Sequence, residues 1–169
     1  VANLLRTGTS GGPLHVMDPL TFMMGEFEAE FPVDRRYAKN HMWALKTDAG
    51  HRFGFSAYAV RLLQDVYFLD WYFDAPAPVR FQQEIGSIES KKAESSLYAP
   101  LTGELLAFNP ALLADPSGIN VDKYSEGWLF DLQESAENEE TLMTAEEYLV
   151  HLKKVWKITQ KTIKGQVNN

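Results

Sequence analysis

The stretch that decides the fold runs from Glu84 to Asn109 and reads EIGSIESKKAESSLYAPLTGELLAFN. Polar and apolar residues alternate before Lys91, which is typical of a strand with two different faces. A short apolar segment follows Lys92, and Pro100 and Gly103 mark a turn before a further apolar run. We predict a strand, a tight tip that bears the two lysines, a return strand, a turn and a third strand.

Regular alternation in the first of these strands separates its side chains onto two faces. One face is expected to carry Ile85, Ser87 and Glu89, and the other to carry Gly86, Ile88 and Ser90. A lysine pair at a hairpin tip is most often ordinary solvated turn chemistry, because lysine is seldom buried. The tip alone therefore does not indicate a function.

The wider pattern resembles the lipoyl-lysine loop of the glycine cleavage system H proteins. Glu-Ser-x-Lys-Ala is followed by Tyr-Ala-Pro-x-x-Gly-Glu, and Gly103 stands eleven residues after Lys92, as in that family. The resemblance implies that Lys92 carries covalent lipoate, with Glu89, Ser90 and Ala93 as the motif around it. Biotin carriers place their lysine between methionines, and none flanks Lys92. Lipoate is the expected cofactor.

Two other stretches carry the same resemblance. Residues 121–132, VDKYSEGWLFDL, follow the family's Asp-x-Tyr-x-Glu-Gly-Trp motif, which is expected to form a closing strand. Residues 40–43, Asn-His-Met-Trp, occupy the place of its His-Glu-Trp strand. The resemblance covers about 33–152 and implies a mainly β fold. That fold is a flattened β barrel-sandwich hybrid of the lipoyl/biotinyl type, with short helices and a C-terminal helix.

Local signals predict further elements. Ser56 is a suitable N-cap for a short helix that ends at Leu63. Residues 66–73 are rich in β-branched and aromatic residues and are expected to form a core strand. Thr144 and Glu147 form a capping-box pattern before a long helix.

We divide the chain into four parts: an N-terminal extension (1–32), a carrier domain (33–133), an acidic linker (134–143) and a C-terminal helix (144–164). The apolar residues of the extension are expected to pack back on the domain. One face of the helix should dock on the barrel. Its lysines form either a solvated face or a docking patch for an acidic partner.

Composition limits the partners. Sixteen basic against 23 acidic residues give a net charge of −7, which argues against nucleic acid. No apolar run approaches the roughly 20 residues that cross a bilayer, and no secretory signal is evident. We expect no membrane association and a cytoplasmic location, or the mitochondrial matrix in a eukaryote.

Candidate sites of other kinds are few. The chain has no cysteine, so any dithiol chemistry must come from a cofactor. The histidines lack paired ligand spacing, so no metal site is expected among His15, His41, His51 and His151. Hydrolase elbows, Walker loops and dinucleotide fingerprints do not occur in the sequence.

The resemblance implies a carrier and not an enzyme. A lipoate ligase or lipoyl transferase would modify Lys92. The arm would then shuttle an aminomethyl group and reducing equivalents between glycine decarboxylase, aminomethyltransferase and dihydrolipoamide dehydrogenase. No residue of the carrier is expected to be catalytic, since such a shuttle needs a long flexible arm and a high effective concentration.

Two positions depart from the family pattern. The family has a glutamate and an aspartate that are thought to hold the loaded amine in a surface cleft, and this chain has Met42 and Ser96 there. Glu94 or Asp70 could supply a substitute carboxylate. The candidate cleft residues are Asn40, Met42, Ser56 and Ser96.

Three functions therefore stay open. The first is a lipoyl carrier in glycine cleavage. The second is an H-like lipoate-binding protein in another pathway, such as sulfur oxidation with heterodisulfide-reductase-like complexes, which the altered cleft motivates. The third is an unlipoylated H-like interaction module, which Lys91, the apolar extension and the basic terminal helix motivate.

Overall fold

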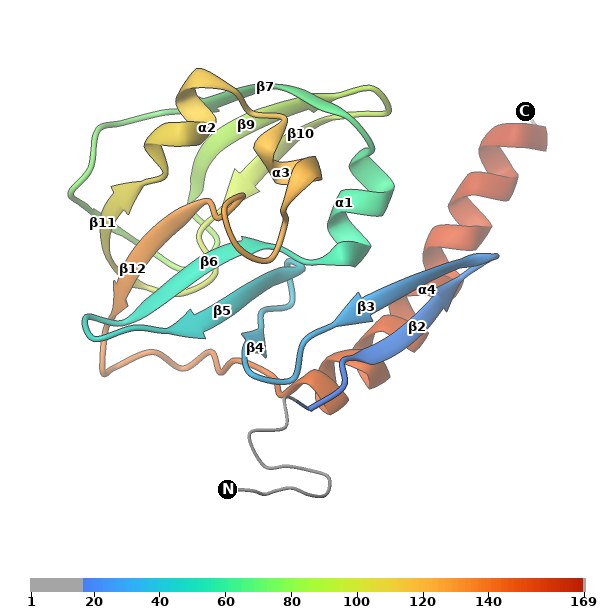
Figure 1. Ribbon diagram of the computed structural model, residues 1–169, viewed down its shortest axis with the longest axis horizontal. Helices are drawn as coiled ribbons and strands as arrows, with labels where there is room; N and C mark the ends of the chain where they lie inside the picture. Colours follow the sequence, from blue (N-terminus) through green and yellow to red (C-terminus); the bar gives the residue numbers. More distant parts are fainter. Residues whose placement is uncertain (1–16, 169) are drawn as a thin grey trace.

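Two antiparallel β-sheets pack against each other and form the body of the protein (Figure 1). The computed structural model describes residues 17–168, with side chains described as far as Lys161. The larger sheet has the strand order β4 (Arg36–Tyr37), β5 (Met42–Lys46), β6 (His51–Phe55), β12 (Phe130–Glu134), β11 (Gly103–Phe108) and β8 (Ala77–Val79). The smaller sheet has the order β10 (Glu94–Tyr98), β9 (Glu84–Ser90) and β7 (Val66–Trp71).

Apolar side chains from both sheets meet in one core. Phe53 and Phe130 stack at 5.5 Å in the larger sheet, and Ile85 and Ile88 enter the same core from the smaller one. Among the described residues the two sheets remain separate hydrogen-bonded ladders, so the sandwich does not close into a barrel. The predicted mainly β sandwich with short helices and a C-terminal helix is confirmed.

The lysine-bearing hairpin is β9 and β10, as predicted, but its side-chain alternation is not regular. Leu97 pairs with Gly86 and Tyr98 pairs with Glu84, which leaves Ile85 as an extra residue in β9. Such a β-bulge re-aims the side chains around it. Ile85 and Ile88 are therefore both fully buried, whereas regular alternation predicted that they lie on opposite faces of the strand.

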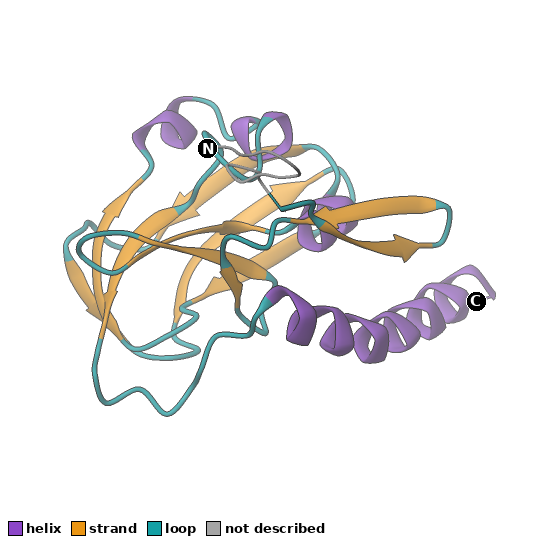
Figure 2. Cartoon of the chain, turned by 60° about the horizontal axis from the view of Figure 1, so that its bottom comes forward, coloured by secondary structure: helices purple, strands orange, loops and turns teal. Residues whose placement is uncertain are grey.

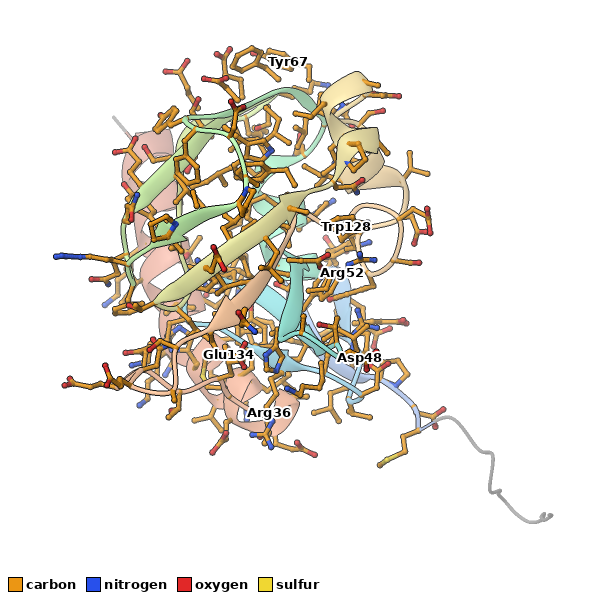
Figure 3. The ribbon with its side chains drawn as sticks, turned by 90° about the vertical axis from the view of Figure 1, so that its left-hand side faces the viewer. Arg36, Asp48, Arg52, Tyr67, Trp128 and Glu134 are labelled. Carbon is orange, nitrogen blue, oxygen red and sulfur yellow. The ribbon has the colours of Figure 1, made fainter. Side chains whose placement is uncertain are left out.

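The strand predicted at 66–73 is present as β7, and its Leu69 and Trp71 pack against the core, but it is not a central strand. The strand β7 ends at Trp71 and lies at the edge of the smaller sheet. Val66 is buried, but Tyr67 and Phe68 are exposed, and Figure 3 shows Tyr67 projecting away from the body. β-Branched and aromatic composition indicates a strand and does not say whether that strand is central.

The predicted closing strand begins later than expected. Val121 ends the short helix α3 (Gly118–Val121), turns occupy 123–127, and β12 starts only at Phe130. The motif residue Trp128 lies beside Arg52 (Figure 3), whose guanidinium carbon is 3.7 Å from the centre of the indole ring. The motif therefore anchors the turn that leads into β12.

Three helices besides α3 complete the fold: α1 (Ala57–Leu63), α2 (Pro110–Ala114) and α4 (Ala145–Asn168). Helix α2 is capped by Asn109, whose side chain accepts a 3.0 Å hydrogen bond from the amide of Ala111. The capping box of α4 is confirmed: the Thr144 amide donates to Glu147 at 2.8 Å, and the Glu147 amide donates back to the Thr144 hydroxyl at 3.1 Å.

The residues before β4 form a hairpin of β2 (Leu20–Met24) and β3 (Phe27–Phe31). This hairpin and α4 lie side by side and project from the sandwich in the same direction (Figures 1 and 2). A second core lies between them and the larger sheet, built around Met24, Ala29, Phe31, Tyr37, Trp43, Tyr58, Tyr148 and Leu152. Residues 20–31 therefore pack back on the domain, as expected, whereas residues 1–16 of the predicted extension lie outside the described residues. No helix in the described part of the chain is long and apolar enough to span a membrane.

Candidate lipoyl-lysine site

The two lysines lie at the tip of the β9–β10 hairpin, in a turn that Ser90 organises. The Ser90 amide donates to the Ala93 carbonyl at 2.8 Å and closes the turn. The Ser90 hydroxyl oxygen, itself buried, accepts from the amides of Lys92 at 3.3 Å and Ala93 at 3.1 Å. The Lys91 amide donates to the Asp65 carbonyl at 2.8 Å. The backbone under Lys92 is held on both sides.

The side chains of Lys91 and Lys92 are exposed. Neither ammonium group forms a hydrogen bond or an ion pair with residues 17–161. The motif residue Glu89 is half-buried on β9 and pairs with Glu94 of β10. A fixed backbone that presents an unengaged amine is suited to covalent modification.

Gly103 lies away from the tip, on β11 in the larger sheet. A Cβ there would overlap the carbonyl oxygen of Gln133 and would come within 2.8 Å of the Glu134 Cα. The position therefore requires glycine because β11 and β12 approach closely. Its place in the motif has a structural reason that does not involve contact with the lysine.

A cleft of about 280 Å³ begins next to the tip, with Ala93 in its wall. Three of the four predicted cleft residues line it: Asn40, Met42 and Ser96. We call this space the cargo cleft. Its remaining walls are His41, Phe55, Ala59, Leu62, Leu63, Ile88, Ser95, Leu97 and Tyr98.

Ser56 lies outside the cargo cleft, contrary to the prediction. It is fully buried and precedes α1, but its hydroxyl makes no cap hydrogen bond to that helix. Instead the Ser56 hydroxyl pairs with the Tyr148 hydroxyl at 2.9 Å. Ser56 belongs to the contact between α1 and α4.

The cargo cleft is largely apolar, and no carboxylate occurs among the described residues that line it. Glu94 and Asp70, the substitutes suggested by the sequence, are not in its walls. Ser96 instead donates a 2.8 Å hydrogen bond to Glu84, which also accepts from Tyr72 at 3.2 Å. Ser96 thus engages a carboxylate beside the cleft.

A second cavity of about 460 Å³ adjoins the cargo cleft and shares Asn40 and Tyr98 with it. The Asn40 side-chain amide donates to the Tyr98 carbonyl at 3.1 Å, between the two spaces. Glu140 lines the second cavity and pairs with Lys39 at 3.5 Å. A carboxylate therefore lies in the space next to the cleft.

His41 is a cleft residue that the sequence did not single out for this role. Its backbone has φ = 72°, and its Nδ1 lies 2.8 Å from the Tyr148 hydroxyl. Burial, and then the nearby His151, lower the pKa of His41 to about 4. The ring is therefore neutral near pH 7. A histidine that precedes an apolar strand does not by itself indicate that its ring lies in the wall of a cleft.

No group of three or more potential metal ligands occurs within the described residues. His41 and His151 have ring centres 5.9 Å apart, whereas His51 pairs with Glu134 at 2.8 Å. His15 lies outside the described residues.

Comparison with known proteins agrees with this geometry. The sequence profile of the family "Glycine cleavage H-protein" matches residues 35–155. A "Probable glycine cleavage system H protein" of Natronomonas pharaonis is 37% identical over 119 residues, which cover 70% of this chain and 94% of that protein. A "Glycine cleavage system H protein" of a Psychrobacter species is 37% identical over 123 residues, covering 72% of this chain and 97% of that protein.

A solved structure is also similar. The crystal structure of a glycine cleavage system H protein from Mycobacterium marinum has a TM-score of 0.62 and 33% sequence identity. The match covers 70% of this chain and 95% of that one. The chain therefore belongs to the glycine cleavage H-protein family, which is the carrier component of the glycine cleavage system.

Proposed function

We propose that this protein is a lipoyl carrier of glycine cleavage in which lipoate is attached to the Lys92 ammonium nitrogen as an amide. The observation that carries the proposal is an exposed, unengaged lysine on a fixed hairpin tip, beside a cleft whose wall begins one residue later, at Ala93. Family membership supports the same role.

The residues at the site fit a lipoyl group. Such an arm is largely apolar, and the cargo cleft offers it apolar walls with a few polar groups at Asn40, Ser95 and Ser96. When bound, lipoate supplies a dithiolane that can accept an aminomethyl group and carry reducing equivalents.

The chain itself contributes position and not acid–base catalysis. Ser90 and the Lys91–Asp65 hydrogen bond hold the tip, so that a modifying enzyme meets one backbone conformation at Lys92. We propose a lipoate ligase or lipoyl transferase as that enzyme. Glycine decarboxylase, aminomethyltransferase and dihydrolipoamide dehydrogenase would be the partners that the arm visits.

Glu140 is the carboxylate we propose for holding an amine cargo. It lines the cavity that continues past Asn40, and its pair with Lys39 is weak because the lysine side chain is 66% exposed. A cationic amine could replace Lys39 there at small cost.

The test is reconstitution of the lipoylated protein with glycine decarboxylase, followed by exchange of the glycine carboxyl carbon with labelled bicarbonate. We expect exchange that depends on the lipoylated carrier and falls several-fold in Glu140→Gln. The exposed neighbour provides a control, Glu139→Gln, which should exchange like the wild type. Absence of exchange with fully lipoylated protein would contradict a role in glycine cleavage.

One observation favours a second candidate. The cargo cleft lacks a carboxylate among its described wall residues and has Met42 where the family has glutamate. A neutral or apolar cargo would suit such a cleft better than an amine. Lipoylation without glycine exchange would identify this alternative, an H-like lipoate carrier for other chemistry.

A further inference from the structure

Two segments of this chain lie outside the part that matches the family, which is residues 35–155. One is the β2–β3 hairpin, and the other is the end of α4 from Trp156 onward. The Natronomonas relative is matched over 119 residues, or 94% of its length, and the Psychrobacter relative over 123 residues, or 97% of its length. We call residues 20–31 and 156–161 together the annex.

Helix α1 stands between the annex and the cargo cleft. Its residues Ala59, Leu62 and Leu63 line the cleft. Tyr58 and Arg61 lie on the other side of the helix and contact the annex. This division follows from helix geometry, since residues three and four apart share a face. The short helix α1 therefore lines the cleft with one face and contacts the annex with the other.

Each part of the annex holds α1 by a specific contact. The Tyr58 ring meets Trp156 edge to face at 6.2 Å. The Thr159 hydroxyl donates to the Val155 carbonyl at 3.0 Å, so its oxygen accepts from the Tyr58 hydroxyl, also at 3.0 Å. The Arg61 guanidinium carbon lies 4.4 Å from the centre of the Phe27 ring.

The same contacts reach the cleft through His41. The ring of this cleft residue lies 4.6 Å from the Tyr58 ring, and its Nδ1 lies 2.8 Å from the Tyr148 hydroxyl. Tyr148 also pairs with Ser56, the residue that precedes α1. His41 is therefore in contact with α1 through Tyr58, and it shares the α4 residue Tyr148 with Ser56.

A helix as short as α1, with seven residues, has little stability of its own and depends on its tertiary contacts. Its first amide, Ala57, donates to the Tyr124 hydroxyl at 2.8 Å. Val60 and Leu63 pack into the main core, and Tyr58 and Arg61 add support from the annex on the other face of the helix. Loss of that support would let the cleft wall formed by Leu62 and Leu63 move.

We propose that the annex is a positioning element for the cargo cleft: through Tyr58 and Arg61 it fixes α1, and so sets how firmly the cleft retains the arm on Lys92. Only the second part of this inference, the retention of the arm, rests on the proposed function. Trp156, Thr159 and Phe27 are the positioning residues.

The first experiment follows amide hydrogen exchange in the unmodified full-length protein, so it does not depend on lipoylation. Trp156→Ala should speed exchange of the amides from Val60 to Gln64 about tenfold and leave those of β9 unchanged. Trp156→Phe, which keeps an aromatic edge, should restore most of the protection. The exposed neighbour gives the control variant Lys157→Ala, which should exchange like the wild type.

The second experiment measures retention of the arm in lipoylated protein. The probe is reduction of the lipoyl disulfide by tris(2-carboxyethyl)phosphine, with free lipoamide in the same tube as reference. We expect the wild-type arm to react more slowly than free lipoamide. In Trp156→Ala the arm should be reduced three- to tenfold faster than in the wild type, so that its rate approaches that of free lipoamide. In Trp156→Phe and Lys157→Ala the rate should stay near that of the wild type.

Unchanged α1 exchange in Trp156→Ala would overturn the proposed support of α1. Faster α1 exchange with an arm as protected as in the wild type would show that the annex stabilises the helix without affecting the cleft, and would also overturn the proposal. Failure of Lys92 to become lipoylated would instead count against the proposed function, and the exchange result would still decide whether the annex holds α1.

Discussion

The backbone amide of Lys91 donates a 2.8 Å hydrogen bond to the carbonyl oxygen of Asp65. This bond ties the hairpin tip to the connection between α1 and β7, because Asp65 lies between Leu63 and Val66. The lysine beside it is therefore fixed relative to α1, the helix that lines the cargo cleft. The attachment point and the cleft wall form one unit.

The hydroxyl of Ser90 organises the tip and is the first target for mutation. In Ser90→Ala the amides of Lys92 and Ala93 lose their acceptor, so the turn should become less ordered. We expect a loss of about 1 kcal/mol in the free energy of unfolding. The kcat/KM for lipoylation by a lipoate ligase should fall roughly three- to tenfold, since side chain–backbone bonds of this kind fix turns.

The matched control is Ser87→Ala, three residues earlier on β9. Its lipoylation kinetics should equal those of the wild type. Equal kinetics in Ser90→Ala would mean that the ligase does not depend on the conformation of the turn.

Gly103 should matter for stability and not for recognition of the lysine. In Gly103→Ala the new methyl group overlaps the Gln133 carbonyl, so β11 and β12 must separate. We expect a loss of roughly 2–4 kcal/mol in the free energy of unfolding, measured by urea denaturation. The molecules that remain folded should be lipoylated at a rate within about twofold of the wild-type rate. A twofold difference is small, since a tenfold difference corresponds to about 1.4 kcal/mol.

A second glycine provides the comparison. At Gly118 an added methyl group would meet only the end of the Leu112 side chain, 3.1 Å away. Gly118→Ala should change the free energy of unfolding by no more than about 1 kcal/mol, in line with the usual effect of glycine in a helix. A milder effect at Gly103 than at Gly118 would contradict the account of strand approach.

The histidine in the cleft wall should make stability depend on pH. The pKa of His41 is lowered to about 4 when the protein is folded and is about 6.5 when it is unfolded. Between these two pH values the unfolded state binds more protons than the folded state. The contribution of His41 to stability is therefore at its full value above pH 6.5. Its contribution declines as pH falls from 6.5 towards 4, by at most about 3 kcal/mol.

The measurement is urea unfolding of wild type and His41→Asn between pH 7.5 and pH 4. Asparagine tolerates the positive φ of this position and does not titrate there. The decline of stability with falling pH should be shallower in the variant. His151 and the carboxylates titrate in both proteins, so parallel curves would show that His41 is not held neutral.

Much of the site could be predicted from the sequence because its signals are local. The hairpin tip follows from alternation and turn residues, and the capping box at Thr144 from a four-residue pattern. Asn40, Met42 and Ser96 meet in one cleft, as the family resemblance implied. Each of these features depends on short spacing or on a motif.

The failures involve partners distant in the sequence. Ser56 looked like a helix cap, but its hydroxyl pairs with Tyr148, 92 residues away. The bulge at Ile85 depends on the pairing of β9 with β10, and nothing in the composition of β7 marks it as an edge strand. Leu62 and Leu63 are cleft residues because the fold places α1 at the same cleft as Ser95 and Leu97 of β10.

The central claim is that Lys92 carries the lipoyl group, and intact mass spectrometry tests it most directly. Wild type, Lys91→Arg and Lys92→Arg would each be incubated with lipoate, ATP and a lipoate ligase. We predict that wild type and Lys91→Arg gain the mass of one lipoyl group and that Lys92→Arg gains none. A wild type that stays unmodified would contradict the account and favour an interaction module, and modification of Lys92→Arg would contradict the choice of lysine.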